Sequence, residues 1–319
     1  MQRLKSVVQM YHYARRARQH PCLIQWRDVF RMAWHQHSLE TVAMVAVPGG
    51  DIQYRSYRPH NDEAAARTPL LITHGGPGSS SIGLYDALHS IADQRPLICY
   101  DQLGSCCSPA DLSADQMTLS RFAVEPLRLL DALELDTVHL LGHSWGGTVM
   151  AEFALQHPHR VSRLVLSSPL LSTARWLADC SLLLAALKPE GQAPAEVEAA
   201  FDRHHFCRLP TPPELLRRDR QRSNSHLYRT MWGETEFRAN GLLADVDLFP
   251  QLASLQASTL LLCGEYDTAT PHTLDQARQC IGAHAALVVL TNAGHKTYID
   301  AHQAYLDAVN GFLAEADAI

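Results

Sequence analysis

The chain of 319 residues is 46% hydrophobic and 19% charged, so it can bury a large core as one domain or as a domain with an insertion. Its net charge of −6 gives no electrostatic footprint for nucleic acid, and no apolar run reaches the roughly 18 residues that a membrane span requires. The composition therefore predicts a soluble globular protein that has neither nucleic acid nor a membrane as a partner.

Residues 1–40 contain six basic residues before the first acidic one, so they superficially resemble a targeting segment. They lack the apolar core of roughly 7 to 15 residues and the small-residue cleavage site of a secretory signal. Leu4, Val7, Val8 and Tyr11 fall at helical spacing, which favours an amphipathic helix. We expect a helical extension that packs on its own domain or on a second subunit, which leaves a homo-oligomer open. Import into an organelle is the alternative.

From residue 41 onward, short apolar runs alternate with helix-length segments, which predicts a mainly parallel sheet wrapped by helices. The runs 41–47 and 52–57, joined by Pro48-Gly49-Gly50-Asp51, indicate an antiparallel hairpin. A helix is predicted over residues 119–133. Six further strands are predicted at residues 70–73, 97–100, 138–141, 164–166, 259–263 and 286–290.

The interval 171–250 breaks this alternation. It is rich in Leu, Ala, Arg and Glu, is punctuated by prolines and offers no convincing strand. Ligands of open α/β sheets bind at the carboxyl ends of the strands, where an insertion at this point of the chain is placed. The interval is therefore predicted to be a helical cap, and residues 41–170 and 251–319 are predicted to form the core domain.

A serine framed by glycines follows the strand 138–141, in Gly142-His143-Ser144-Trp145-Gly146-Gly147. With a strand before it and a helix-like stretch after it, this pattern indicates a nucleophile elbow rather than a chance match in a glycine-containing loop. The sharp turn holds the serine oxygen at the tip of the sheet, and the glycines relieve the crowding that a strained backbone creates. Ser144 is therefore the candidate nucleophile.

A serine hydroxyl near neutral pH is a poor nucleophile until a base takes its proton, and that base is commonly a histidine held by a carboxylate. In enzymes with such an elbow, the acid and then the histidine follow the serine, each on a loop after a late strand. The strand 259–263 leads to Asp267, and the strand 286–290 leads to His295. These two residues are the predicted orienting acid and general base, and Glu265 is the rival carboxylate.

Such a hydrolase also needs backbone N–H groups that stabilise negative charge on the attacked carbonyl oxygen. One donor is expected from Trp145, the residue after the nucleophile. The other is expected from the loop His74-Gly75-Gly76-Pro77-Gly78, which follows the strand 70–73. Glycines in this loop let the main chain approach the substrate closely.

Eight cysteines are scattered along the chain without a C-x-x-C pair or regular spacing, so neither a zinc site nor a redox motif is indicated. Several fall within predicted strands or helices, as small buried residues do, which suits a reducing compartment. We therefore expect a cytoplasmic protein that uses no metal and no cofactor.

Five motifs in this order resemble those of the proline iminopeptidase (prolyl aminopeptidase) family of α/β-hydrolase serine peptidases. They are His74-Gly75-Gly76-Pro77-Gly78, Asp101-Gln102-Leu103-Gly104, the elbow at Ser144, Gly264-Glu265-Tyr266-Asp267 and Gly294-His295. The resemblance covers the chain from about residue 42 to its C-terminus. It implies an α/β-hydrolase fold with an inserted helical cap. It also implies Ser144, Asp267 and His295 as the catalytic triad, and Gly76 with Trp145 as the oxyanion donors.

The stretch 228–237 resembles the cap of this family, and the resemblance implies that Glu236 binds the free α-amino group of the substrate. A carboxylate in a partly desolvated pocket supplies both charge and hydrogen bonds to an amine, whereas a solvated glutamate is the plainer alternative. Trp145, Trp232, Phe237 and Tyr298 are candidate apolar walls of the substrate pocket, and aromatic residues at such places belong equally often to a core.

Two positions depart from the family pattern. Thr268 stands where relatives often carry a second acidic residue, and Cys106 stands in place of a glycine. The leading expectation is a serine hydrolase that releases an N-terminal residue, proline or another small or apolar amino acid, from peptides or amino-acid amides through an acyl-enzyme. The alternatives are an amidase, esterase or acyl-transferring relative acting on small amino-acid derivatives, and a non-catalytic binding protein.

Overall fold

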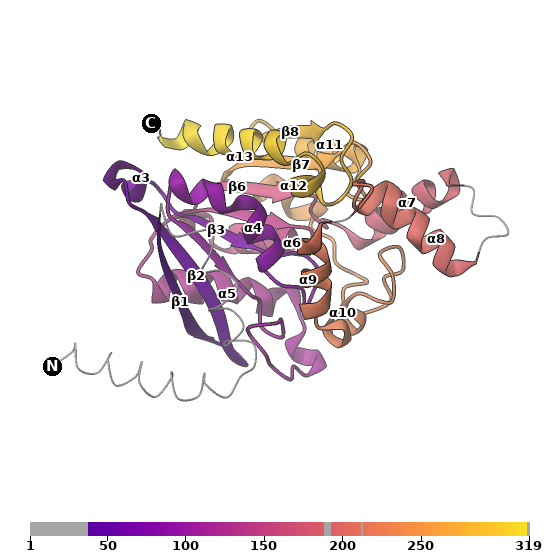
Figure 1. The fold of residues 1–319 in the computed structure, drawn as a ribbon, viewed down its shortest axis with the longest axis horizontal. Helices are drawn as coiled ribbons and strands as arrows, with labels where there is room; N and C mark the ends of the chain where they lie inside the picture. Colours follow the sequence, from indigo (N-terminus) through magenta and orange to yellow (C-terminus); the bar gives the residue numbers. More distant parts are fainter. Residues whose placement is uncertain (1–37, 188–192, 212, 318–319) are drawn as a thin grey trace. The chain divides into compact units, whose positions relative to one another are not determined.

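The computed structural model describes residues 38–187, 193–211 and 213–317 (Figure 1). The helical extension predicted for residues 1–40 lies outside these ranges except for its last three residues. Those three residues belong to a strand, β1 (Ser38–Val47).

Eight strands form one sheet in the order β1-β2-β4-β3-β5-β6-β7-β8. The pairs from β4 through β8 are parallel, and β2 pairs antiparallel with β4. All the predicted strands are present, and the predicted hairpin corresponds to β1 and β2, which Pro48 and Gly49 join. The strands after β1 are β2 (Gly50–Pro59), β3 (Leu70–Thr73), β4 (Leu97–Tyr100), β5 (Val138–His143), β6 (Val161–Ser167), β7 (Ser258–Gly264) and β8 (Ala285–Leu290).

The central strands are buried on both faces, as their continuous apolar sequences require. Side chains alternate between two core clusters: Leu71 belongs to one, and its neighbours Leu70 and Ile72 belong to the other. The first cluster includes residues of α5 (Leu119–Ala132), α6 (Trp145–Gln156) and α11 (Pro271–Ile281), and the second includes residues of α4 (Ile82–Leu88) and α13 (His302–Asp317).

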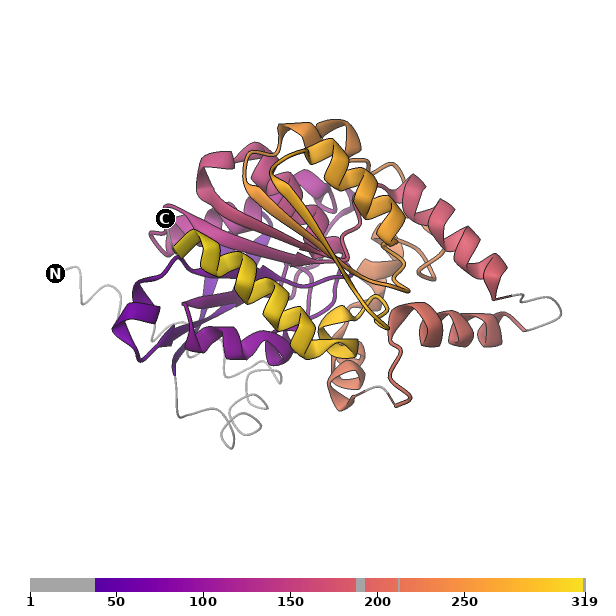
Figure 2. The same cartoon turned by 90° about the horizontal axis from the view of Figure 1, so that it is seen from above.

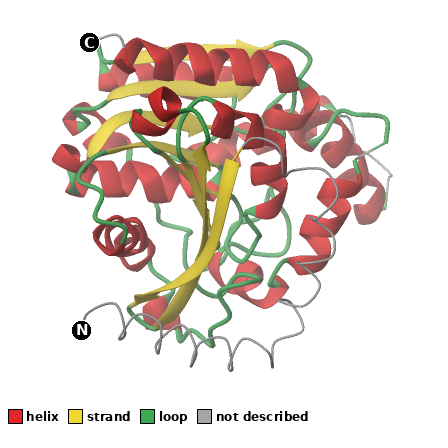
Figure 3. Ribbon diagram, turned by 60° about the vertical axis from the view of Figure 1, so that its left-hand side comes forward, coloured by secondary structure: helices red, strands yellow, loops and turns green. Residues whose placement is uncertain are grey.

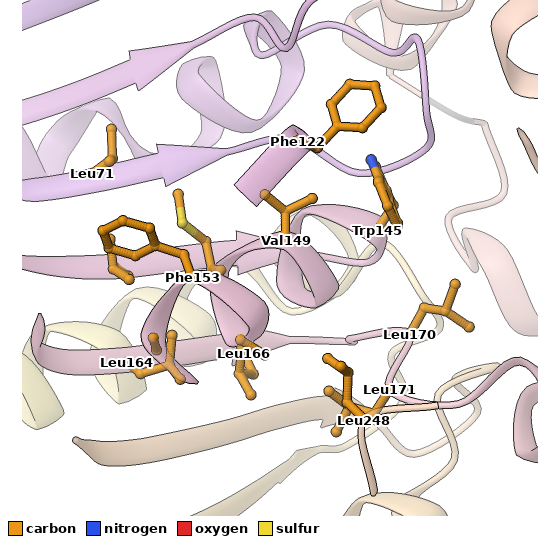
Figure 4. Packing of buried hydrophobic residues seen from close by; sticks show 14 of the residues in the cluster. Leu71, Phe122, Trp145, Val149, Phe153, Leu164, Leu166, Leu170, Leu171 and Leu248 are labelled. Atoms are coloured by element: carbon orange, nitrogen blue, oxygen red, sulfur yellow. The ribbon is translucent and has the colours of Figure 1, made fainter. Parts of the chain in front are cut away.

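The helices thus form a layer on each face of a twisted sheet (Figures 2 and 3). Figure 4 shows how α6 fills the first cluster, where Val149 and Phe153 lie between Leu71 of β3 and Leu164 of β6. Two short α-helices, α3 (Asp62–Ala66) and α12 (Thr297–Asp300), also belong to the core. This packing fixes the N-terminus of α6 at the carboxyl edge of the sheet.

Between β6 and β7 the described residues form helices and turns, and no strand of the sheet is among them. The helices are α7 (Thr173–Ala186), α8 (Pro194–Phe201), α9 (Glu214–Arg222) and α10 (Ser225–Met231). They lie beyond the carboxyl ends of the parallel strands in both views (Figures 1 and 2). We call residues 171–250 the cap segment.

The two ends of the cap segment are bonded to each other where they leave the sheet. Ser172 and Asp247 form an isolated β-bridge, and the Leu248 N–H donates to the Leu171 carbonyl at 2.8 Å. The Thr173 hydroxyl also donates to the carbonyl of Leu243 at 2.7 Å. The segment therefore leaves and re-enters the core at one place.

Two further observations bear on the composition. Among the described residues, no helix has both the length and the apolar content that crossing a bilayer takes. The seven cysteines that the structure describes are all free thiols, and five of them are buried.

Replacing Gly146 with alanine tests how tightly α6 packs on the sheet. A Cβ at this position would lie 2.4 Å from the carbonyl oxygen of His74 and 2.8 Å from that of Thr73. Because both atoms are backbone, we expect Gly146→Ala to lower the free energy of unfolding by about 1–3 kcal/mol. Urea denaturation measures this quantity.

Gly311→Ala is the matched control. Nothing lies within 4 Å of a Cβ at Gly311, which is inside α13. Alanine there should raise the free energy of unfolding by about 0.5–1 kcal/mol, because glycine weakens a helix interior. Equal stability of Gly146→Ala and the wild type would contradict the close packing described for the elbow.

Candidate active site

Ser144 stands at the turn between β5 and α6. Its backbone has φ 55° and ψ −124°, a conformation that residues other than glycine rarely adopt. The turn is tight enough that a Cβ on Gly142 would lie 2.2 Å from the carbonyl oxygen of Gly146. Only glycine fits there, which is why the serine needs glycine neighbours. Strained backbone of this kind recurs at functional sites.

Asp267 and His295 meet at the ends of neighbouring strands. Asp267 lies on the loop after β7, His295 on the loop after β8, and the His295 Nδ1 lies 2.8 Å from the Asp267 Oδ1. Each residue is 1% exposed. With the Nδ1 hydrogen donated to the carboxylate, the other ring nitrogen, Nε2, is left able to accept a proton.

The Asp267 carboxylate is held by several donors besides His295. Its Oδ2 accepts from the Ser168 hydroxyl at 2.6 Å and from the Gly264 N–H at 3.2 Å. Its Oδ1 accepts from the Ala269 N–H at 2.9 Å. These bonds fix the direction in which the carboxylate faces the imidazole ring.

A pocket opens over Ser144 and is lined from both the core and the cap segment. Its core residues include Gly76, Ser144, Trp145, His295 and Lys296. Its cap residues include Trp176, Phe206, Tyr228, Trp232, Glu236 and Leu243. The nucleophile candidate, the histidine and the predicted amine-binding glutamate therefore share one pocket.

Two of the predicted aromatic walls lie elsewhere. Phe237 packs against Phe201, with ring centroids 5.1 Å apart, and Tyr298 is buried edge-on against His143 at 5.0 Å. Neither is among the residues that line the pocket, whereas Trp145 and Trp232 are. Trp176 and Phe206 are pocket residues that the sequence did not single out, and their rings lie 5.4 Å and 5.2 Å from that of His295.

Two residues that line the pocket have backbone N–H groups without an acceptor among the described residues. Within the described residues, no atom accepts a hydrogen bond from the backbone N–H of Gly76 or of Trp145. Trp145 is the first residue of α6, where N–H groups lack partners within the helix and favour negative charge. Gly76 has φ +51°, which its lack of a side chain permits.

Gln102 connects the two segments that carry these amides. Its amide nitrogen donates to the hydroxyl of Thr73 at 3.0 Å and to the carbonyl of His74 at 2.9 Å. Its amide oxygen accepts from the indole nitrogen of Trp145 at 2.8 Å. The glutamine thereby holds the loop after β3 against the elbow.

Glu236 is oriented by its neighbours in the cap segment. The Tyr228 hydroxyl donates to its Oε1 at 2.9 Å, and the indole nitrogen of Trp176 donates to its backbone carbonyl at the same distance. Burial, together with the charge of Glu236, raises the pKa of Tyr228 well above its usual value. The phenol therefore keeps the proton with which it binds the carboxylate.

The two departures from the family pattern fall outside the pocket lining. Thr268 is buried, and its hydroxyl lies 3.4 Å from the Asp267 Oδ1 and 3.3 Å from the His295 Nδ1. Cys106 lies beside Cys107, with their sulfur atoms 3.6 Å apart. Residue 268 therefore contacts the acid–histidine pair and is not among the residues that line the pocket.

Sequence reasoning missed Ser168, Gln102, Tyr228 and Lys296 as site residues. Ser168 follows β6 directly and has φ +48°, so its position at the carboxyl end of a strand was the available signal. Gln102 and Tyr228 lie within motifs that the sequence displayed, but their partners are distant along the chain. The pocket position of Lys296 depends on how the cap segment folds.

Residues 68–302 match the family described as alpha/beta hydrolase fold. The proline iminopeptidase of Heyndrickxia coagulans is 33% identical over 289 residues, which cover 86% of this chain and 98% of that protein. The proline iminopeptidase of Levilactobacillus brevis is 32% identical, and the match covers 82% of this chain and 94% of that protein. A solved proline iminopeptidase from Mycobacterium smegmatis is 26% identical, with a TM-score of 0.79 over 87% of this chain and 99% of its own.

The sheet order, the strand-to-helix turn and the matching family place this chain among the α/β hydrolases, which makes it a hydrolytic enzyme. The sequence identity to the curated relatives identifies the family within this class. The chain belongs to the proline iminopeptidase family. The fold class and the family indicated by the five motifs are thereby confirmed.

The choice between the two carboxylates of the loop after β7 can be tested by mutation. Asp267→Ala removes the partner of the His295 Nδ1, so we expect kcat for an activated acyl ester to fall by about 10⁴-fold. The rate is measured by release of the chromogenic alcohol.

Glu265→Ala is the matched control. Its Oε2 accepts the Asn292 N–H at 2.9 Å at the surface, and Glu265 is not among the residues lining the pocket. We expect its kcat to stay within about threefold of the wild-type value, because substitutions at exposed positions away from the site usually have small effects. If kcat falls strongly in Glu265→Ala and is kept in Asp267→Ala, Glu265 and not Asp267 is the acid that orients His295.

Proposed function

We propose that this chain is a serine aminopeptidase that releases an N-terminal residue, proline or another small or apolar amino acid, from peptides or amino-acid amides. The observation that carries the proposal is one pocket lined by Ser144, His295 and Glu236. Curated relatives of this chain are named proline iminopeptidase, which supports the same substrate class.

In the proposed reaction, the Ser144 oxygen attacks the scissile carbonyl while His295 Nε2 takes the hydroxyl proton. His295 then gives this proton to the leaving amine, and an acyl-enzyme remains. Water activated by the same ring hydrolyses the ester and restores Ser144. Asp267 keeps the ring in the required tautomer and stabilises the imidazolium that forms, as its 2.8 Å contact with Nδ1 allows.

The tetrahedral intermediate places a negative charge on the former carbonyl oxygen. We assign the backbone N–H groups of Gly76 and Trp145 as its donors, because both residues line the pocket and neither amide is already bonded within the described residues. Donors that are fixed before the reaction need no reorganisation as charge develops.

Glu236 supplies the recognition of the amine. Its Oε1 accepts from the Tyr228 hydroxyl, and the apolar rings of Trp176 and Trp232 line the same pocket. A carboxylate in such surroundings binds an ammonium group with charge-assisted hydrogen bonds. Since the amine of an N-terminal residue lies one carbon from the scissile carbonyl, a glutamate in the pocket of Ser144 selects substrates with a free amine.

This assignment gives the core and the cap segment different roles. Residues 41–170 and 251–319 form the hydrolase core that holds the triad, and the cap segment is the lid that supplies Glu236 and most aromatic walls. We also propose a cytoplasmic location, in keeping with the free thiols of the seven described cysteines.

Glutamate-dependent amine recognition predicts a specific kinetic signature. Glu236→Gln should raise KM for prolyl and alanyl arylamides by about 10- to 100-fold, because a hydrogen bond between charged groups is replaced by a neutral one. The value for an amine-free acyl ester should change little. The control is Glu234→Gln, since Glu234 is exposed and is not among the pocket residues.

A panel of prolyl, alanyl and leucyl arylamides, amino-acid amides and simple acyl esters completes this test on the wild-type enzyme. Higher kcat/KM for amine-bearing substrates supports the aminopeptidase. Preference for amine-free esters would identify an esterase. Preference for amino-acid amides over arylamides would identify an amidase. If the folded protein hydrolyses none of these substrates, the chain is a binding protein.

A further inference from the structure

Lys296 is an unusual residue in this chain. Only three of its 27 basic residues are lysines, at positions 5, 188 and 296, and Lys296 is the one lysine that the structure describes. It directly follows His295 and is partly exposed to the pocket that it lines. The compact ammonium charge of a lysine therefore stands next to the reacting groups, where the proposed mechanism gives it no task.

The ammonium group contacts aromatic rings rather than an anion. Its Nζ lies 5.0 Å from the ring centroid of Phe206 and 5.7 Å from that of Tyr298. Among the described residues, no carboxylate oxygen lies within 4.0 Å of Nζ and no side-chain hydrogen bond from it is formed. The rings attract the cation but leave its three hydrogen-bond donors available.

Two little-exposed arginines of the described residues contact a carboxylate directly. Arg95, with 2% of its side chain exposed, binds Asp317 at 2.7 Å, and Arg121 contacts the fully buried Glu125. An unpaired cation in a partly desolvated space costs free energy, and such unpaired charges are concentrated at functional sites. The difference between Lys296 and these arginines indicates that its anion arrives with the substrate.

The charges around Lys296 define the kind of ligand that fits. Burial lowers the pKa of Lys296, and the carboxylates of Asp219 and Glu236 act against this effect most strongly. Asp219 is engaged with the backbone N–H of Gly83, and Glu236 with Tyr228. The pocket thus offers an anionic and a cationic side chain, at Glu236 and Lys296, that do not neutralise each other by contact.

We propose that Lys296 binds a carboxylate of the substrate, so that the enzyme prefers substrates carrying both a free amine and a nearby carboxylate. This inference rests on the proposed aminopeptidase function, in which Glu236 binds the amine. The carboxylate has two possible sources. It is either the C-terminus of a dipeptide, on the leaving-group side, or the side chain of an N-terminal Asp or Glu residue.

Two matched substrate pairs distinguish these sources. The first compares Pro-Ala with Pro-Ala amide, and the second compares glutamyl arylamide with glutaminyl arylamide. In the wild type, we expect kcat/KM to favour the carboxylate member of one pair by about tenfold or more, the value of a charge-assisted contact. The pair that shows this preference identifies the source of the carboxylate.

The same ratio is then measured in variants. In Lys296→Met it should fall to about one, and in Lys296→Arg, which keeps the charge, it should stay well above one. Because each ratio is taken within one variant, a general loss of activity does not change it. Arg217→Met removes an exposed positive charge that pairs with Glu214 on α9, and it should keep the wild-type ratio.

Wild-type ratios near one for both pairs would overturn the inference, as would an unchanged preference in Lys296→Met. These outcomes are distinct from failure of the proposed function. If prolyl and alanyl arylamides are hydrolysed while neither pair shows a preference, only the role of Lys296 is wrong. If no amine-bearing substrate is hydrolysed at all, the aminopeptidase itself is wrong, and the carboxylate inference falls with it.

Discussion

The active-site geometry depends on close backbone packing around Ser144. A Cβ on Gly75 would lie 2.8 Å from the Ser144 Cβ, and one on Gly142 would lie 2.2 Å from the Gly146 carbonyl oxygen. The loop after β3, the end of β5 and the start of α6 therefore approach one another at distances that only glycine permits. This packing maintains the positive φ of the serine, because strained backbone persists only where its surroundings determine it. The same contacts bring the amides of Gly76 and Trp145 into one pocket.

The cap segment is joined to the core at the histidine loop as well as at its base. The backbone N–H groups of His295 and Lys296 donate to the carbonyls of His205 and Phe206, both at 2.8 Å. Residues of the cap are thereby held in register with the acid–histidine pair. Ser144 of the core and Glu236 of the cap line one pocket, so in the proposed reaction these backbone hydrogen bonds keep the nucleophile and the amine-binding residue in place relative to each other.

Much of the fold was predictable because short apolar strands bounded by turn residues carry a strong local signal. The predicted helix 119–133 ends within one residue of α5, whereas β6 begins three residues before its predicted start. Arg163 obscured that start: within the strand, it pairs with Glu315 and lies over the ring of Phe312, both on α13. The motifs also brought together Ser144, Asp267, His295 and Glu236. Contacts between the cap and the core carry no local signal, so the placement of Phe237 and the unpaired state of Lys296 required the structure.

The central claim is that Ser144 is the nucleophile of a preformed hydrolytic site, and active-site labelling tests it most directly. Folded protein is treated with a fluorophosphonate, which reacts with activated serines, and the intact mass and the modified peptide are determined by mass spectrometry. We expect one adduct per chain, located on Ser144, with hydrolytic activity lost in proportion to labelling and no adduct in Ser144→Ala. An adduct on another residue, or an active enzyme that remains unlabelled, would contradict the assignment.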